Sequence, residues 1–216
     1  MATLPDSVAE ARGQVRVLLD EPTAAFWTDD EIDSWVVEAT GDVATKTLCF
    51  EAKNTAVDVV DNQVYADEPT DCIKINSIQF YDGDAGTYRG MAEIHPRLKG
   101  HLPNSNTSGG DPYYWFHYRS RIYLDPIPVS THANDKLHVY FAQYTSDMTD
   151  LPDEYQPFII KYATAMARLK ERKNVEAVRM YVEYLNDLRY HRADLLTHPV
   201  DSQDMLHQPD RTVRAR

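Results

Sequence analysis

The sequence predicts an α+β protein in which a bundle of helices is interrupted by a β-rich insertion. Apolar residues recur at helical spacing at both ends of the chain. Between them, β-branched and aromatic runs alternate with clusters of Asn, Asp, Gly and Pro, which indicates short strands joined by turns. We expect helices over residues 1–50, a β-rich domain over 51–148, a helical hairpin over 149–197 and an extended tail over 198–216.

Two N-terminal helices are predicted from their caps. Ser7 is a suitable N-cap for a first helix, which Pro22 ends. At the start of the second helix, Thr28 and Glu31 have the spacing of a capping box, in which each side chain bonds the backbone N–H of the other residue. We expect this second helix to continue to about Phe50.

The β-rich segment contains three clear strand signals. One strand is expected to end in a turn at Asp82-Gly83-Asp84, and another alternates so that Leu137, Val139 and Phe141 face one side of a sheet. The strands are expected over residues 73–81, over 112–118 and 122–124 as a hairpin around Arg119-Ser120, and over 136–144. The polar, glycine-rich segment 102–111 is expected to be a surface loop or a contact arm.

Two long helices with a short connection follow, which predicts an antiparallel hairpin. Asp153 and Gln156 are candidate capping partners, and Pro157 is tolerated in the first turn. The last helix has apolar residues at a spacing of three and four, which predicts a single apolar face made of Val175, Val178, Val182, Leu185 and Leu188.

Composition narrows the class of protein. The formal net charge of −12 argues against a general nucleic-acid binder, although DNA can slide past an acidic wall without sticking to it. No apolar run is as long as a membrane span, and residues 1–10 lack the pattern of a secretory signal, so we expect a protein folded in the cytoplasm with no membrane partner. Cys49 and Cys72 have no metal or redox spacing and are expected to be buried.

No catalytic motif is recognisable. The eight histidines are scattered without an HExxH pair, and no phosphate-binding glycine loop or nucleophile elbow is present. Carboxylates are plentiful, so a hydrolytic pair stays an alternative. Asp82-Gly83-Asp84 lacks the remainder of a calcium loop and is interpreted as a turn. We therefore expect no enzyme activity, no cofactor and no metal.

The aromatic run from Pro112 to Tyr118 lies on a predicted strand, so alternate side chains face opposite ways. Stacking on bases or sugars is one interpretation. The favoured one is a strand packed by the core on one side and by a neighbouring subunit on the other. The candidate contacts to a subunit or to the tail are Tyr113 and Trp115 of this run and Asn104 and Asn106 of the preceding loop.

The order of the motifs resembles the head–tail connector adaptor proteins of tailed bacteriophages, especially the adaptor ring of short-tailed phages. The resemblance spans residues 26–188. It is carried by the helix start Phe26-Trp27-Thr28-Asp29-Asp30-Glu31, the turn at Tyr81-Asp82-Gly83, the hairpin from Tyr118 to Pro128, and Leu151-Pro152 before the helical hairpin.

The resemblance implies a virion protein, assembled in the host cytoplasm, that forms a ring of typically twelve copies. The ring docks under the portal protein, carries the tail nozzle or tail tube, and lets genomic DNA pass without specific binding. Another neck or tail-tube component and a virion-associated hydrolase are the alternatives. Because C-terminal segments of the family reach toward the portal, the candidate portal-binding residues are Met205, Leu206, His207, Arg211, Val213, Arg214 and Arg216.

Overall fold

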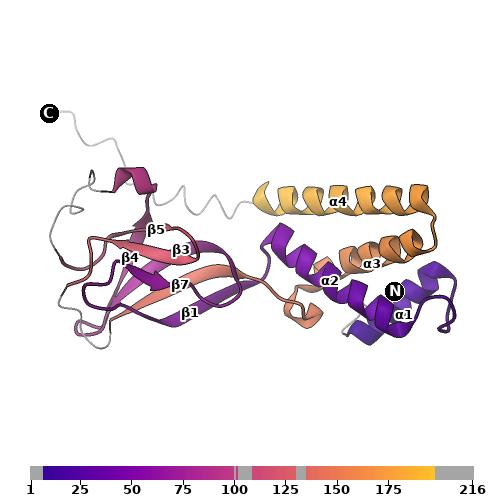
Figure 1. Cartoon of the computed structure of the whole chain (residues 1–216), viewed down its shortest axis with the longest axis horizontal. Helices are drawn as coiled ribbons and strands as arrows, with labels where there is room; N and C mark the ends of the chain where they lie inside the picture. The colour runs from indigo at the N-terminus through magenta and orange to yellow at the C-terminus, as the bar shows by residue number, and fades with distance from the viewer. Residues whose placement is uncertain (1–6, 100, 102–108, 130–134, 198–216) are drawn as a thin grey trace. The chain divides into compact units, whose positions relative to one another are not determined.

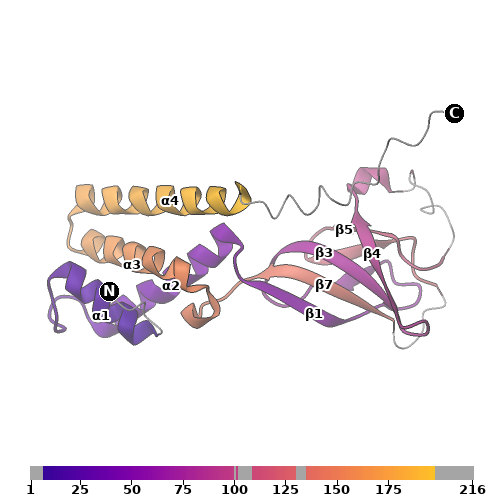
Figure 2. The same ribbon diagram turned by 180° about the vertical axis from the view of Figure 1, so that it is seen from behind.

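The computed structural model describes residues 7–99, 101, 109–129 and 135–197, with side chains described as far as residue 191. The chain divides into a helical unit, residues 1–43 with 153–216, and a β unit, residues 44–152. Among the described residues, four α-helices and a seven-stranded sheet confirm the predicted α+β class (Figures 1 and 2).

The first two helices of the helical unit, α1 (Val8–Leu19) and α2 (Asp29–Thr47), begin at the predicted caps. Ser7 Oγ accepts a hydrogen bond from the backbone N–H of Glu10 at 3.3 Å. The capping box of α2 is formed, because Glu31 Oε2 accepts from Thr28 N at 3.0 Å and Thr28 Oγ1 accepts from Glu31 N at 3.3 Å. These bonds satisfy backbone donors that the first turn leaves unpaired.

The prediction that α2 continues to about Phe50 is wrong. The helix ends at Thr47, because Leu48 adopts a left-handed conformation with φ of 58°. Strand β1 (Glu51–Asp58) then begins where the helix was expected to finish. A left-handed residue terminates a helix in the way glycine commonly does, and a leucine in that place gives no signal in the sequence.

Helices α3 (Gln156–Lys170) and α4 (Asn174–Thr197) run side by side as the predicted antiparallel hairpin (Figures 1 and 2). Gln156 Nε2 donates to Asp153 Oδ1 at 3.3 Å, so the expected pair does interact. It does not cap the helix, since Tyr155 occupies the N-cap position without a side-chain cap. Pro157 lies in the first turn, as expected.

A buried junction ties the N-terminal part of the helical unit to α3. Trp27 is buried, and its indole N–H donates to the carbonyl of Ala167 at 3.0 Å. Arg16, also buried, donates to the carbonyl of Trp27 at 2.9 Å and to Asp29 Oδ1 at 2.5 Å. On the surface beside this junction, Lys170 Nζ donates to both carboxylate oxygens of Glu31 at 2.7 Å.

Two tyrosine–carboxylate pairs connect α2 to the C-terminal hairpin. The buried Tyr184 hydroxyl donates to Asp42 Oδ2 at 2.6 Å, and the Tyr162 hydroxyl donates to Glu38 Oε1 at 2.9 Å. Burial, and then the neighbouring carboxylate, raises the pKa of both phenols above the ordinary value. Both hydroxyls therefore stay protonated and act as donors at neutral pH.

The β unit has one twisted seven-stranded sheet with the order β1-β7-β3-β4-β5-β6-β2. All neighbouring strands pair antiparallel except β4 and β5, which are parallel. The strands that follow β1 are β2 (Tyr65–Asp67), β3 (Cys72–Asp82), β4 (Thr87–Glu93), β5 (Tyr114–His117), β6 (Arg121–Asp125) and β7 (Lys136–Gln143).

The predicted strands of the β unit are confirmed, and three others had no individual prediction. Strands β3 and β7 and the β5–β6 hairpin lie at the expected places, with positive φ at Arg119 and Ser120 in the tight turn. Leu137, Val139 and Phe141 of β7 all belong to the core cluster, as their alternation predicted. Strands β1, β2 and β4 were missed because they are short or largely exposed and so lack a clean apolar alternation.

Replacing Trp27 tests the buried junction. Trp27→Ala removes a large buried ring and its hydrogen bond, so we expect the free energy of unfolding to fall by about 3–5 kcal/mol. Urea denaturation followed by circular dichroism measures the change. Phe26→Ala is the matched control, because the neighbouring ring is exposed, and its loss is expected to cost less than about 1 kcal/mol. Equal losses in both variants would contradict this account.

Replacing Glu31 tests the capped start of α2. The hydrogen bond from Lys170, followed by those from Thr28, lowers the pKa of Glu31 from 4.5 to about 2. A carboxylate with a lowered pKa stabilises the fold fully above its unfolded-state pKa and loses that effect as the pH falls through the folded-state value.

We therefore expect Glu31→Gln to lower the melting temperature near neutral pH, with the difference from the parent protein shrinking as the pH approaches 2. Asp30→Asn, a change of charge in the same first turn, is the control for the helix dipole. The account is wrong if the two variants show the same dependence of melting temperature on pH.

Candidate interaction surfaces

An exposed row of valines runs along α4 of the helical unit. Val175, Val178 and Val182 are 88%, 57% and 47% exposed, and their spacing places them on one face of the helix. We call these three residues the valine face. The helix predicted from this spacing is present, but of the five residues only Leu188 is buried, and the buried side of α4 also uses Ala177 and Tyr184.

An apolar groove adjoins the valine face. It has a volume of about 240 Å³ and contains no charged residue. Leu169 of α3 and Val178 of α4 are both exposed at this groove, so it opens to solvent. The residues that line it, from α3 and α4, are Ala165, Met166, Leu169, Ala177, Val178 and Tyr181. We call this feature the α3–α4 groove.

The segment from the end of α3 to the start of α4 is rich in basic residues. The segment 168–179 has five basic and two acidic residues, a net charge of +3 in a chain whose net charge is −12. Four of these five basic residues are paired within the unit: Arg168 and Lys173 contact Glu171 at 3.0 and 2.8 Å. Lys170 contacts Glu31 at 2.7 Å, and Arg179 contacts Glu183 at 3.0 Å. An apolar surface with a charged rim is the usual composition of a protein–protein contact.

A second surface lies on the β unit, on the side of the sheet opposite its core. Three rings from β3, β4 and β7 pack there: Tyr81 lies 4.8 Å from Tyr88 and 5.7 Å from His138 between ring centroids, and Tyr88 lies 5.0 Å from His138. Lys53 and Lys136 flank the rings. These five residues, with Thr55 and Gly83, line a hollow of about 560 Å³. We call it the aromatic–lysine face.

His138 is the inner residue of the aromatic–lysine face. It is 8% exposed, and within the described part of the chain its Nδ1 has no hydrogen-bond partner. Burial, and then the charge of Lys53, lowers the pKa of His138, so the ring is neutral at neutral pH. Beside it, the Tyr140 hydroxyl donates to Gln79 Oε1 at 3.3 Å, and Lys53 Nζ lies 4.9 Å from the Tyr140 ring centroid.

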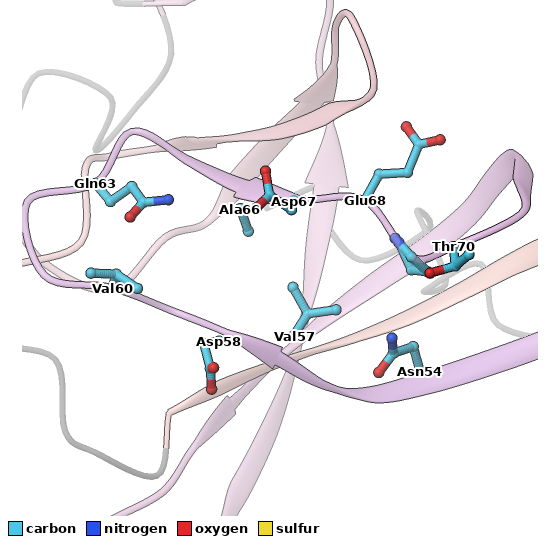
Figure 3. A pocket seen from close by; sticks show the side chains of 10 residues that line it. Asn54, Val57, Asp58, Val60, Gln63, Ala66, Asp67, Glu68 and Thr70 are labelled. Atoms are coloured by element: carbon cyan, nitrogen blue, oxygen red, sulfur yellow. The ribbon is translucent and has the colours of Figure 1, made fainter.

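A third hollow, of about 430 Å³, lies between β1 and β2 and contains three carboxylates. Asp58 and Glu68 point in opposite directions within it (Figure 3). Each carboxylate has a basic side chain beside it: Asp58 pairs with Lys136, Glu68 lies 2.5 Å from His117, and Asp67 lies 3.9 Å from Arg121. No group of three metal-binding side chains occurs among the described residues, here or elsewhere.

The structure places few of the candidate contact residues. Tyr113 is exposed, with the Arg89 guanidinium 4.1 Å from its ring centroid, so it is available on the surface. Trp115 is 2% exposed and belongs to the core of the β unit. Asn104, Asn106 and the candidate portal-binding residues 205–216 lie outside the described residues.

Two further expectations concern the cysteines and the membrane. Cys49 and Cys72 are thiols that are not joined in a disulfide, and both are only half-buried, less enclosed than expected. Burial, and then the charge of Glu68, raises the pKa of Cys72 to about 11, so this thiol stays protonated at neutral pH.

None of the described helices has the length and apolar character needed to cross a membrane.

Comparison with solved structures gives only distant likenesses. A chain in the neck of an empty GTA particle is 14% identical over 76% of this chain and 80% of that one, with a TM-score of 0.29. A chain in the virion of a native gene transfer agent (GTA) particle is 13% identical over the same shares, with a TM-score of 0.29. Scores this low support no structural argument. No curated protein matches the chain.

Comparison with protein families gives a match along most of the chain. The sequence profile of the SU10 adaptor protein family matches residues 6–209, which include both helical segments and the whole β unit. The match confirms the resemblance to phage adaptor proteins that the order of the motifs indicated. The chain belongs to the SU10 adaptor protein family.

Proposed function

We propose that this protein is a structural component of a virion neck, an adaptor that joins the portal protein to the tail. The observation that carries the proposal is the family match over residues 6–209. In this role the chain acts by binding other proteins and has no catalytic site. A different neck or tail-tube component is the nearest alternative, and no feature of the described residues favours a hydrolase.

The valine face and the α3–α4 groove support the binding role. Burying a fully exposed valine or leucine side chain contributes about 1.5–3 kcal/mol, so burying the exposed parts of the three valines and of Leu169 would add to the stability of an interface. A ring uses one patch of each copy against a different patch of the next copy. We propose that this surface is one half of such a contact in a ring, for which the family resemblance suggests twelve copies.

The proposed contacts with the portal protein, with a neighbouring subunit or the tail, and with DNA rest on the family resemblance. We propose that the C-terminal segment with Met205, Leu206, His207, Arg211, Val213, Arg214 and Arg216 binds the portal protein. Tyr113, with Asn104 and Asn106, is proposed to contact a neighbouring subunit or the tail nozzle. Trp115 contributes to this contact only by supporting the strand from inside. Genomic DNA is proposed to pass along a wall that its net charge of −12 keeps from sticking.

A charge placed on the valine face tests the proposed assembly surface. We expect Val178→Asp and Val182→Asp to abolish association with further copies of the chain, because each buries an unpaired carboxylate in the interface. Analytical ultracentrifugation of the chain with and without portal rings measures the association. Monomer folding is expected to be unchanged, since both valines are exposed.

The matched control is Val60→Asp, the same substitution at an exposed valine of the β unit. It is expected to assemble like the parent protein. A chain truncated after Thr197 separates the contribution of the tail from that of the valine face. If the parent protein binds neither itself nor the portal under any condition, the proposed function fails. If the two α4 variants assemble normally, only the assignment of this surface fails.

A further inference from the structure

We propose that the aromatic–lysine face of the β unit binds a short single-stranded nucleotide segment by stacking its bases on Tyr81 and Tyr88. The inference rests on the geometry of this face and is independent of the proposed adaptor role. The face consists of Lys53, Tyr81, Tyr88, Lys136 and His138 around a hollow of about 560 Å³.

The first step of the argument is the exposed aromatic surface. Tyr88 is 59% exposed although its ring packs against two others, so one side of it is open to solvent. Tyr81 is held from below by the nearly parallel ring of His138, with an interplanar angle of 15°. Tyrosines fixed by neighbours on a sheet are pre-organised for stacking on a base, and every base offers such a face.

The second step is the position of the cations. Lys53 and Lys136 flank the rings on β1 and β7, and no carboxylate lines the hollow. Asp58 neutralises Lys136, which leaves Lys53 as the cation available to a phosphate. Lys53 lies over the Tyr140 ring and is therefore held beside the stacking rings. A base on the tyrosines and a phosphate at Lys53 fit the alternation of base and phosphate along a nucleic-acid strand.

The third step is the polar ring of His138, which lines the hollow. His138 is neutral and buried, and its Nδ1 has no partner among the described residues. A buried polar atom without a hydrogen bond is costly, and a bound molecule or a water can supply the missing bond. Gln79 lies opposite His138 in the strand register, and its Oε1 accepts from the Tyr140 hydroxyl at 3.3 Å. The His138 ring is suited to the polar edge of a stacked base.

The chemistry favours a single strand over a duplex. Stacking on a side chain requires a base that is free of its own neighbours, which duplex DNA does not offer. The chain's net charge of −12 repels the dense phosphates of a duplex, whereas a short single strand presents only a few phosphates to Lys53. The site is therefore expected to tolerate any base and to be sensitive to salt.

Fluorescence anisotropy with labelled (dT)8 and (dA)8 tests the proposal on the full chain. We expect both oligonucleotides to bind at low salt, and Tyr88→Ala to weaken binding about tenfold. Tyr88→Phe keeps the ring and is expected to bind like the parent protein. Lys53→Ala is expected to reduce the salt dependence, lowering the slope of log K against log salt by about 0.7.

The matched control is Tyr118→Ala, which removes an exposed tyrosine of the same unit at the β5–β6 turn. It is expected to leave binding unchanged, and circular dichroism checks that every variant is folded. A labelled duplex of the same length is the comparison for strandedness. The proposal is overturned if neither oligonucleotide binds, if Tyr88→Ala and Tyr118→Ala behave alike, or if the duplex binds as tightly as the single strands.

Discussion

The orientation of helix α4 about its own axis determines which surface this protein presents to others. The helix has apolar residues on two faces, and only one can pack inside the helical unit. Tyr184 selects that face, because its hydroxyl reaches Asp42 of α2 only from the inside, and Ala177 and Leu188 follow it inward. The neighbouring pair of Tyr162 with Glu38 holds α3 against α2. Val175, Val178 and Val182 are consequently left in solvent.

This arrangement relates stability to assembly. When a buried tyrosine hydroxyl donates to a carboxylate, both groups gain a hydrogen-bond partner. The hydrogen bond requires one relative orientation of the two helices, whereas valines can pack in many orientations. The helical unit is thus fixed by a few polar pairs and by the Trp27 junction, while the apolar α4 surface remains available. The row of three exposed valines on a long helix is the observation behind the contact surface that we propose.

Charge is unevenly distributed over the protein, so that local patches differ from the acidic chain as a whole. The chain as a whole is acidic, yet the segment 168–179 has a net charge of +3 and the aromatic–lysine face contains no carboxylate. Each carboxylate between β1 and β2 lies beside a basic side chain, Lys136, His117 or Arg121. Net charge alone therefore describes the long-range field of the protein and says little about what a particular surface can bind.

The sequence predicted local features well and surface assignments poorly. The capping box of Thr28 and Glu31, the turn at Arg119-Ser120 and the core side of β7 depend on short-range spacing, and the structure confirms them. The exposed valines could not be found in this way, because helical periodicity shows that a face is apolar but not whether anything covers it. The aromatic–lysine face was missed because it unites residues from four strands whose register no local pattern reveals.

The central claim is that this chain is a neck component bound between portal and tail, and the most direct test is to locate it in the assembled particle. Cryo-electron microscopy of virions carrying a small tag inserted at the Gly86 turn of the β3–β4 hairpin would show its position. The account predicts a ring of tag density between the portal and the tail. Tag density elsewhere in the virion, or virions that contain none of the protein, would contradict it.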